Sequence, residues 1–205
     1  MSRTCGDTHG RMRLDAHPAG YSLTELVLVV AIVGLTCAAS VPTWAATVDA
    51  GRARHAAQFV ASACRDARTQ AIARNATEAL VFDQSGARWT YRRCHDGNGN
   101  GLRRADITRG TDTCDAVVDL GTLFGGVRIA TDASVPDPDG GAGSIDPVKF
   151  GASNVASFTP AGTATAGTVY LQSPAGALFA VRVAGATGRT RVLRFNQSQS
   201  NWQEE

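Results

Sequence analysis

The chain has 205 residues, enough for one folded domain and an appended segment. Hydrophobic residues make up 43% of it, a composition that excludes an intrinsically disordered chain and predicts a buried core. The formal net charge is only +2, but no acidic residue occurs from Pro147 to Gln203, so this region is locally positive.

Residues 1–20 are predicted to form a removable leader peptide. The leader carries Arg3, Arg11 and Arg13, and basic residues on this side of an apolar segment favour the cytoplasm. The start codon remains open between Met1 and Met12, because Met12 would begin a shorter leader with the sequence MRLDAHPAG.

Residues 21–48 are predicted to form a transmembrane helix. No charged residue occurs from Leu26 to Val48, and a helix of this length would extend about 34 Å, enough to cross the hydrocarbon core. Glu25 lies at the margin of this apolar run. A carboxylate there costs a few kcal/mol unless it finds a partner or reaches the headgroups.

The string GYSLTELVLVVAIVGL, which begins at Gly20, resembles the class III signal of type IV prepilins and type II secretion pseudopilins. The resemblance implies that prepilin peptidase cleaves after Gly20 and that Tyr21 becomes the N-methylated terminus. It also implies that Glu25 pairs with the N-terminal amine of a neighbouring subunit during assembly. Tyr21 departs from the more usual phenylalanine.

Residues 49–76 are predicted to form the amphipathic half of the same long helix, ending near Arg74 or Asn75. Apolar side chains recur at helical spacing and predict one face packed on a domain: Ala56, Phe59, Val60, Ala63, Cys64, Ala67 and Ala71. The segment ACRDARTQAIARNATEALVFD is similar to the helix-to-strand segment of the GspH/FimT branch of pseudopilins.

Residues 77–205 are predicted to form a β-rich globular domain. Short strand-like runs are separated by Gly, Pro, Asn and Asp and indicate an antiparallel sheet. The runs are 79–82, 88–93, 117–123, 127–130, 148–150, 168–172, 178–183 and 191–195. Residues 131–145 are predicted to be a loop. The fold class is thus α+β, and the resemblance makes it type IV pilin-like, with the long helix packed on the sheet.

Cys94 and Cys114 bracket a loop rich in Gly, Asn and Asp, and an exported domain would allow them to form a disulfide. Two independent thiols are the alternative. Asp96 to Gly101, with the sequence DGNGNG, resembles the opening of a calcium loop, but the twelfth position is Ile107 and not a carboxylate. An Asx turn is therefore favoured over a calcium site.

No residue pattern predicts catalysis, and no cofactor is expected. The four histidines form no pair at helical spacing for a zinc site: His9, His17, His55 and His95. No nucleophile stands beside a recognisable base, and no phosphate-binding loop occurs. The chain is therefore predicted not to be an enzyme.

The sequence Gly188-Arg189-Thr190-Arg191 is predicted to lie at the tip of a short hairpin. Alternation places Arg182 on the face opposite Phe179, Val181 and Val183. We expect four arginines to form one exposed cluster with no acid nearby and with Lys149 as an auxiliary cation: Arg182, Arg189, Arg191 and Arg194. Such guanidinium groups suit phosphate oxygens.

GRTR resembles the GRxR element of FimT-type minor pilins, which bind DNA during natural transformation. The resemblance implies sequence-independent contact with double-stranded DNA, mainly through Arg189 and Arg191. The alternative is an H-type minor pseudopilin that acts structurally in type II protein secretion. Both imply other pilin subunits and prepilin peptidase as partners, and a single-pass protein of the bacterial inner membrane with its domain in the periplasm.

Overall fold

The computed structural model describes residues 20–205, except for the side chains of residues 39–43. The predicted leader up to residue 19, with both candidate start positions, lies outside the described residues. The described chain divides into two units, one that ends at Pro42 and one from Thr43 to Glu205.

In the first unit the described chain consists of Gly20 and a short lead into helix α1 (Leu23–Arg74), followed by the first part of that helix. Its apolar side chains are exposed, including Leu23, Leu26 and Leu35. Within residues 20–205, no helix is both long and apolar enough to cross a membrane. The transmembrane span predicted for residues 21–48 is thus not found among them.

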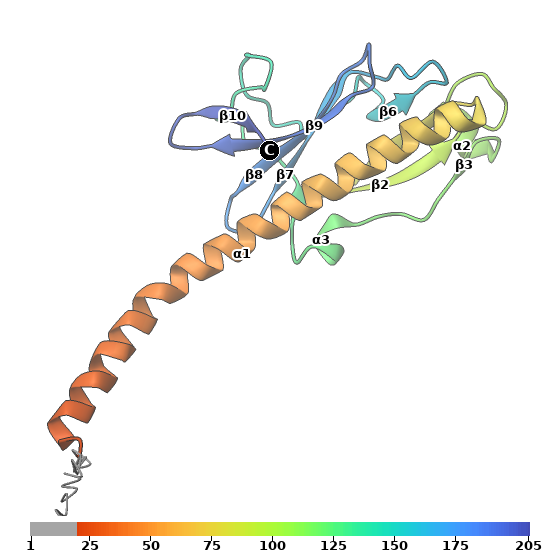
Figure 1. The fold of residues 1–205 in the computed structure, drawn as a ribbon. Helices are drawn as coiled ribbons and strands as arrows, with labels where there is room; N and C mark the ends of the chain where they lie inside the picture. The colour runs from red at the N-terminus through yellow and green to blue at the C-terminus, as the bar shows by residue number, and fades with distance from the viewer. Residues whose placement is uncertain (1–19) are drawn as a thin grey trace, which may run out of the picture. The chain divides into compact units, whose positions relative to one another are not determined.

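The second unit combines the rest of α1 with two antiparallel sheets (Figure 1). The first sheet has the order β3-β2-β1-β6 and contains β1 (Glu78–Ser85), β2 (Arg88–His95), β3 (Thr113–Cys114) and β6 (Val155–Phe158). The second has the order β10-β9-β8-β7-β4, with β5 also paired to β7. Its strands are β4 (Arg128–Ile129), β5 (Val148–Lys149), β7 (Gly167–Gln172), β8 (Leu178–Val183), β9 (Thr190–Asn196) and β10 (Asn201–Glu204). The α+β class is confirmed.

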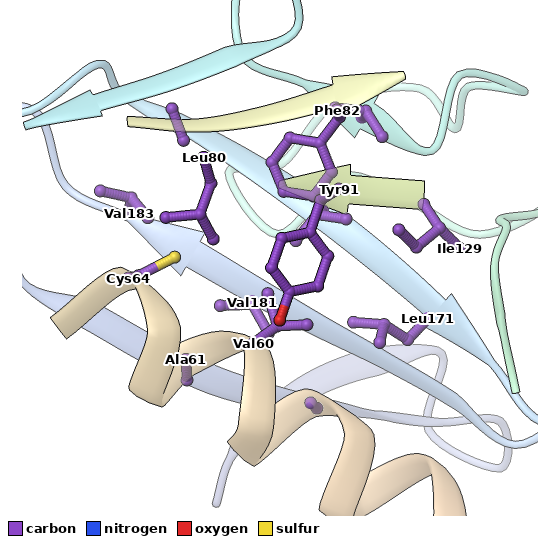
Figure 2. Close-up of a cluster of buried hydrophobic side chains, with 14 of the residues drawn as sticks. Val60, Ala61, Cys64, Leu80, Phe82, Tyr91, Ile129, Leu171, Val181 and Val183 are labelled. Atoms are coloured by element: carbon purple, nitrogen blue, oxygen red, sulfur yellow. The ribbon is translucent and has the colours of Figure 1, made fainter. Parts of the chain in front are cut away.

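The face of α1 that packs on the sheets is built mainly from alanine. Its fully buried residues are Ala53, Ala56, Ala57, Val60, Ala61, Cys64, Ala67 and Ala71. Figure 2 shows Val60, Ala61 and Cys64 directed toward the side chains of the strands. Phe59, which was expected on this face, is 40% exposed, and its ring instead lies 5.5 Å from that of Phe124. The predicted stripe is therefore correct apart from the position of Phe59 and the half-buried Ala63.

The carboxyl end of α1 is where the sequence predicts it. Asn75 follows Arg74 with a left-handed backbone (φ 51°), and the amide of Ala76 donates to the carbonyl of Ala71 at 3.3 Å. Asparagine tolerates this conformation better than most residues, so it ends the helix and turns the chain into β1.

Aromatic rings fill the interior beside α1. The ring of Phe82 stacks on Phe150 at 5.7 Å and lies 5.8 Å from Tyr91, which Figure 2 places over the helix. These contacts link β1 and β2 of the first sheet to Phe150, the residue that follows β5 of the second sheet. The two sheets therefore share one hydrophobic core with the helix.

Five short elements of the structure were not predicted. The expected strand 117–123 contains the short helix α3 (Leu120–Leu123), because the Asp119 carboxylate accepts the amide of Gly121 at 2.9 Å and caps it. A second helix, α2 (Arg104–Arg109), lies inside the cysteine loop. Strands β3, β6 and β10 were also missed, and β10 proves important for the basic cluster.

Candidate nucleic-acid interface

The predicted hairpin is formed by β8 and β9, with Arg189 and Arg191 at its end. The turn is closed by the Ala184 amide, which donates to the carbonyl of Arg189 at 2.9 Å, and by the Gly188 amide, which donates to the carbonyl of Ala184 at 2.8 Å. In the register of the two strands Arg182 pairs with Arg191. The hairpin thus brings three of the predicted arginines together.

A row of cations crosses the second sheet. Lys149 pairs with Thr168, Thr168 with Arg182, and Arg182 with Arg191, so the row passes over β5, β7, β8 and β9. Since side chains alternate along a strand, Arg182 lies on the face opposite the buried Val181 and Val183. Lys149 therefore belongs to the same surface as the hairpin arginines.

The expectation that no acid lies near these cations is wrong. The Asp139 carboxylate pairs with Arg182, and Asp137 Oδ2 lies 2.6 Å from Lys149 Nζ. Glu204 lies 3.6 Å from both Arg189 and Arg191. The acids come from two segments that are distant from the hairpin in sequence, the loop 131–145 and strand β10, so the local sequence around the arginines could not reveal them.

The loop 131–145 is anchored to the second sheet by polar contacts. Trp202 Nε1 donates to the carbonyl of Pro136 at 2.7 Å, and the Tyr170 hydroxyl donates to Asp137 Oδ2 at 3.1 Å. Burial acts to raise the pKa of Asp137, but hydrogen bonds from Lys149, the Asp139 amide and Tyr170 outweigh it and lower this pKa. Burial and the Asp137 charge raise the pKa of Tyr170. Asp137 is thus an anion at neutral pH, and it neutralises Lys149.

Arg194 does not belong to the predicted cluster. It pairs with Phe179 across the sheet and therefore lies on the face of Phe179, opposite that of Arg191. There it lines a separate cleft of about 410 Å³ together with Asp49 of α1. The prediction failed because Arg191 and Arg194 are separated by an odd number of positions on one strand, which places them on opposite faces.

Two arginines that sequence reasoning did not select lie beside the hairpin. Arg65 and Arg68 of α1 line a cleft of about 540 Å³ with residues 187–190, and Arg65 also lines a neighbouring cleft with Arg191. We call Arg65, Arg68, Arg189 and Arg191 the hairpin–helix cluster. Their positions on the helix could have identified them from the sequence. Arg65 and Arg68 directly follow Cys64 and Ala67, which are buried residues of the packed face.

The predicted disulfide is present between Cys94 on β2 and Cys114 on β3, with Cα atoms 4.0 Å apart. The loop that it closes has the predicted Asx geometry: Asp96 Oδ1 accepts the amides of Asn98 and Gly99, and Oδ2 accepts that of Gly101. No group of potential ligands in the described chain could hold a metal ion. The carboxylate of Asp96 is directed to the loop's own amides.

The predicted processing and assembly residues lie at the beginning of the described chain. Gly20, Tyr21 and Glu25 are all exposed. Glu25 lies in the first turn of α1, where a carboxylate interacts favourably with the positive end of the helix dipole. An exposed carboxylate in this position is accessible to a partner molecule.

The chain matches no protein-family model, no curated protein and no solved structure. Its binding properties must therefore be inferred from its own side chains. At the end of the β8–β9 hairpin the hairpin–helix cluster presents four guanidinium groups, and Glu204 is paired with two of them. The excess positive charge favours an anionic ligand.

Proposed function

We propose that this chain is a pilin-like subunit that assembles through the beginning of α1 and binds double-stranded DNA through Arg189 and Arg191. The observation that carries the proposal is the hairpin–helix cluster, whose four guanidinium groups outnumber the one carboxylate paired with Arg189 and Arg191. Guanidinium groups bind phosphate oxygens in a bidentate manner, so a polyphosphate backbone is the ligand that such a surface fits best.

The proposed assembly rests on the first part of α1. Prepilin peptidase would cleave after Gly20, and Glu25 would pair with the methylated amine of Tyr21 in a neighbouring subunit. Large apolar side chains that are exposed along this segment, such as Leu26 at 59% and Leu35 at 79%, need an apolar environment. Before assembly the bacterial inner membrane would surround these side chains, and after assembly other subunits would cover them. The β-rich domain would lie in the periplasm.

DNA binding by this surface would not depend on base sequence. Guanidinium groups that bind backbone phosphates carry no information about base sequence, because the phosphates are the same at every base pair. Arg182 and Lys149 would contribute less than Arg189 and Arg191, because Asp139 and Asp137 already neutralise them. Arg194, on the other face of the sheet, would contribute nothing.

The test replaces Arg189 and Arg191 by alanine in the full chain, purified in detergent. We expect the affinity for duplex DNA, measured by fluorescence anisotropy, to fall about tenfold, which corresponds to about 1.4 kcal/mol. The slope of log affinity against log salt should fall by about one for each phosphate that the variant no longer binds. Arg194→Ala removes one positive charge from the opposite face and should leave both quantities unchanged. Unchanged binding by the Arg189/Arg191 variant would rule out this mechanism.

Glu204 should weaken DNA binding, because its carboxylate pairs with both hairpin arginines. We expect Glu204→Gln to raise the affinity for duplex DNA about threefold, since exposed ion pairs of this kind contribute about 0.2–1 kcal/mol each. Glu205→Gln is the matched control, because it removes the same charge from the next residue, which pairs with Arg54 instead. An equal gain from both variants would show that only net charge matters.

The second candidate is a structural H-type pseudopilin of a type II secretion system. The observation that favours it is the position of β10 at the edge of the second sheet, where a partner protein can add a strand. The neighbouring genes distinguish the two candidates. Secretion genes in the same operon favour the structural pseudopilin, whereas minor pilin or competence genes favour the DNA-binding subunit. Co-purification with other secretion pseudopilins, without DNA binding, would support the structural role.

A further inference from the structure

The polar groups that line the cleft between α1 and the β8–β9 turn are guanidinium and hydroxyl groups. The cleft has a volume of about 540 Å³ and is formed by Arg65, Arg68 and Thr69 of the helix and by residues 187–190 of the turn. Its side chains are three guanidinium groups and three hydroxyls, and no carboxylate lines it. Glu204 lines the neighbouring cleft beside Arg191. This cleft therefore has the composition of an anion site.

The backbone of the turn fixes Arg68 in place. Arg68 Nε donates to the carbonyl of Gly162 at 3.1 Å. Gly188 has a left-handed backbone (φ 60°), and a Cβ atom built on it would lie 2.8 Å from both Cδ and Nε of Arg68. Because glycine leaves this space empty, the side chain of Arg68 packs directly against the turn. Its guanidinium group is thus held at the cleft before any ligand arrives.

The hydroxyl group of Thr190 is a second, independent indication of a ligand site in this cleft. Its Oγ1 atom is buried and has no hydrogen-bond partner, although buried hydroxyls are generally paired. Thr190 lines this cleft and also the neighbouring one with Arg65. Arg65 is exposed, and no ion pair with a described carboxylate satisfies it. The unpartnered Thr190 hydroxyl and the Arg65 guanidinium group, which has no ion-pair partner, form an arrangement that a phosphate oxygen would complete.

We infer that this cleft holds a backbone phosphate of DNA, bound by Arg65 and Arg68 and by the Thr190 hydroxyl. The inference rests on the proposed function and extends it from the hairpin to the helix. The DNA strand would pass from Arg191 and Arg189 over the turn to α1. The group bound in the cleft would be a phosphate oxyanion. We assign it to the phosphodiester backbone of DNA and not to free phosphate, because Thr190 lines both this cleft and the neighbouring cleft of Arg191.

The test compares Arg65→Ala with Arg52→Ala in the full chain in detergent. Both are exposed arginines of α1, but Arg52 lines neither the cleft nor its neighbour. We expect Arg65→Ala to lower the affinity for duplex DNA about fivefold and the salt slope by about one, and Arg52→Ala to change neither. Equal effects of the two variants would overturn the inference, because helix charge alone would then explain the loss.

The variant Thr190→Val tests whether the Thr190 hydroxyl binds the ligand or stabilises the fold. The hydroxyl has no partner in the protein, so its removal should leave the thermal midpoint of unfolding unchanged or raise it. We expect the DNA affinity to fall about threefold while the salt slope stays the same, because a hydroxyl carries no charge. Saturable binding of inorganic phosphate that depends on Thr190, with DNA binding unaffected, would overturn the assignment to DNA.

The two proposals can fail separately. If the Arg189/Arg191 variant loses DNA binding while Arg65→Ala and Thr190→Val retain it, the cleft is not a phosphate site and the proposed function stands. If the unmodified chain does not bind DNA at all, the proposed function is wrong, and the inference about the cleft is wrong with it.

Discussion

Replacing both Arg74 and His95 by alanine is expected to lower the free energy of unfolding by about 3–5 kcal/mol. Glu78 is fully buried, and its carboxylate lies 2.8 Å from His95 Nδ1 and 3.3 Å from Arg74 Nη1. Removal of both partners would leave a carboxylate without a counter-charge inside the protein. A urea unfolding curve followed by tryptophan fluorescence measures the loss.

The control for this experiment adds Glu78→Gln to the double variant. An amide of nearly the same size carries no charge, so most of the lost stability should return. The single variants should cost less than the pair, because either partner alone still contacts Glu78. A double variant within about 1 kcal/mol of the unmodified chain would contradict the burial of a charged Glu78.

Loss of the Cys94–Cys114 disulfide is expected to lower the free energy of unfolding by about 3 kcal/mol in the chain-entropy account. The bridge closes the segment that contains α2 and joins the edge strand β3 to β2. Reduction opens the loop and raises the conformational entropy of the unfolded chain, which stabilises the unfolded state relative to the folded one. Urea unfolding with and without dithiothreitol provides the measurement.

The matched variant for the disulfide is the double replacement of Cys94 and Cys114 by alanine. Dithiothreitol should then have no effect on its stability, whereas it should weaken the chain that retains the bridge. In the folded chain burial raises the pKa of the Cys64 thiol to about 12 and keeps it protonated and unreactive. Cys37 is an exposed free thiol, and urea exposes Cys64, so both chains in this comparison carry Cys37→Ala and Cys64→Ala. Insensitivity to the reductant of the chain that retains the bridge would show that the bridge does not stabilise the fold.

Most of the fold could be predicted from periodicity. The spacing of Ala56, Val60 and Cys64 identifies the packed face of α1, and alternation identifies β7, β8 and β9. Division into two sheets could not be predicted, since strand order depends on pairing between distant segments. The helix α3 was missed because its apolar residues also fit a strand, and its start is stabilised by Asp119, whose carboxylate accepts the Gly121 amide and the Thr122 hydroxyl.

The basic site was only partly predictable. The GRTR string marks Arg189 and Arg191 directly, because both lie in one short segment. Their acidic partner Glu204 was missed because strand β10 was not predicted. Arg65 joins the site through the packing of α1 on the hairpin, a contact between segments that are more than a hundred residues apart. The helical position of Arg65 places it beside the packed face of α1, but local sequence does not show which strand it meets there.

The close approach of Gly188 to Arg68 has a consequence for how such a protein can change during evolution. Any side chain at position 188 would strain the left-handed backbone and collide with the stem of Arg68. A shorter residue at position 68 would remove the contact with Arg68 but leave the collision with the carbonyl oxygen of Gly162, which lies 2.7 Å from the added Cβ atom. Glycine is therefore required at position 188 whatever residue stands at position 68, whereas position 68 can change on its own with the loss of its charge and its hydrogen bond to Gly162.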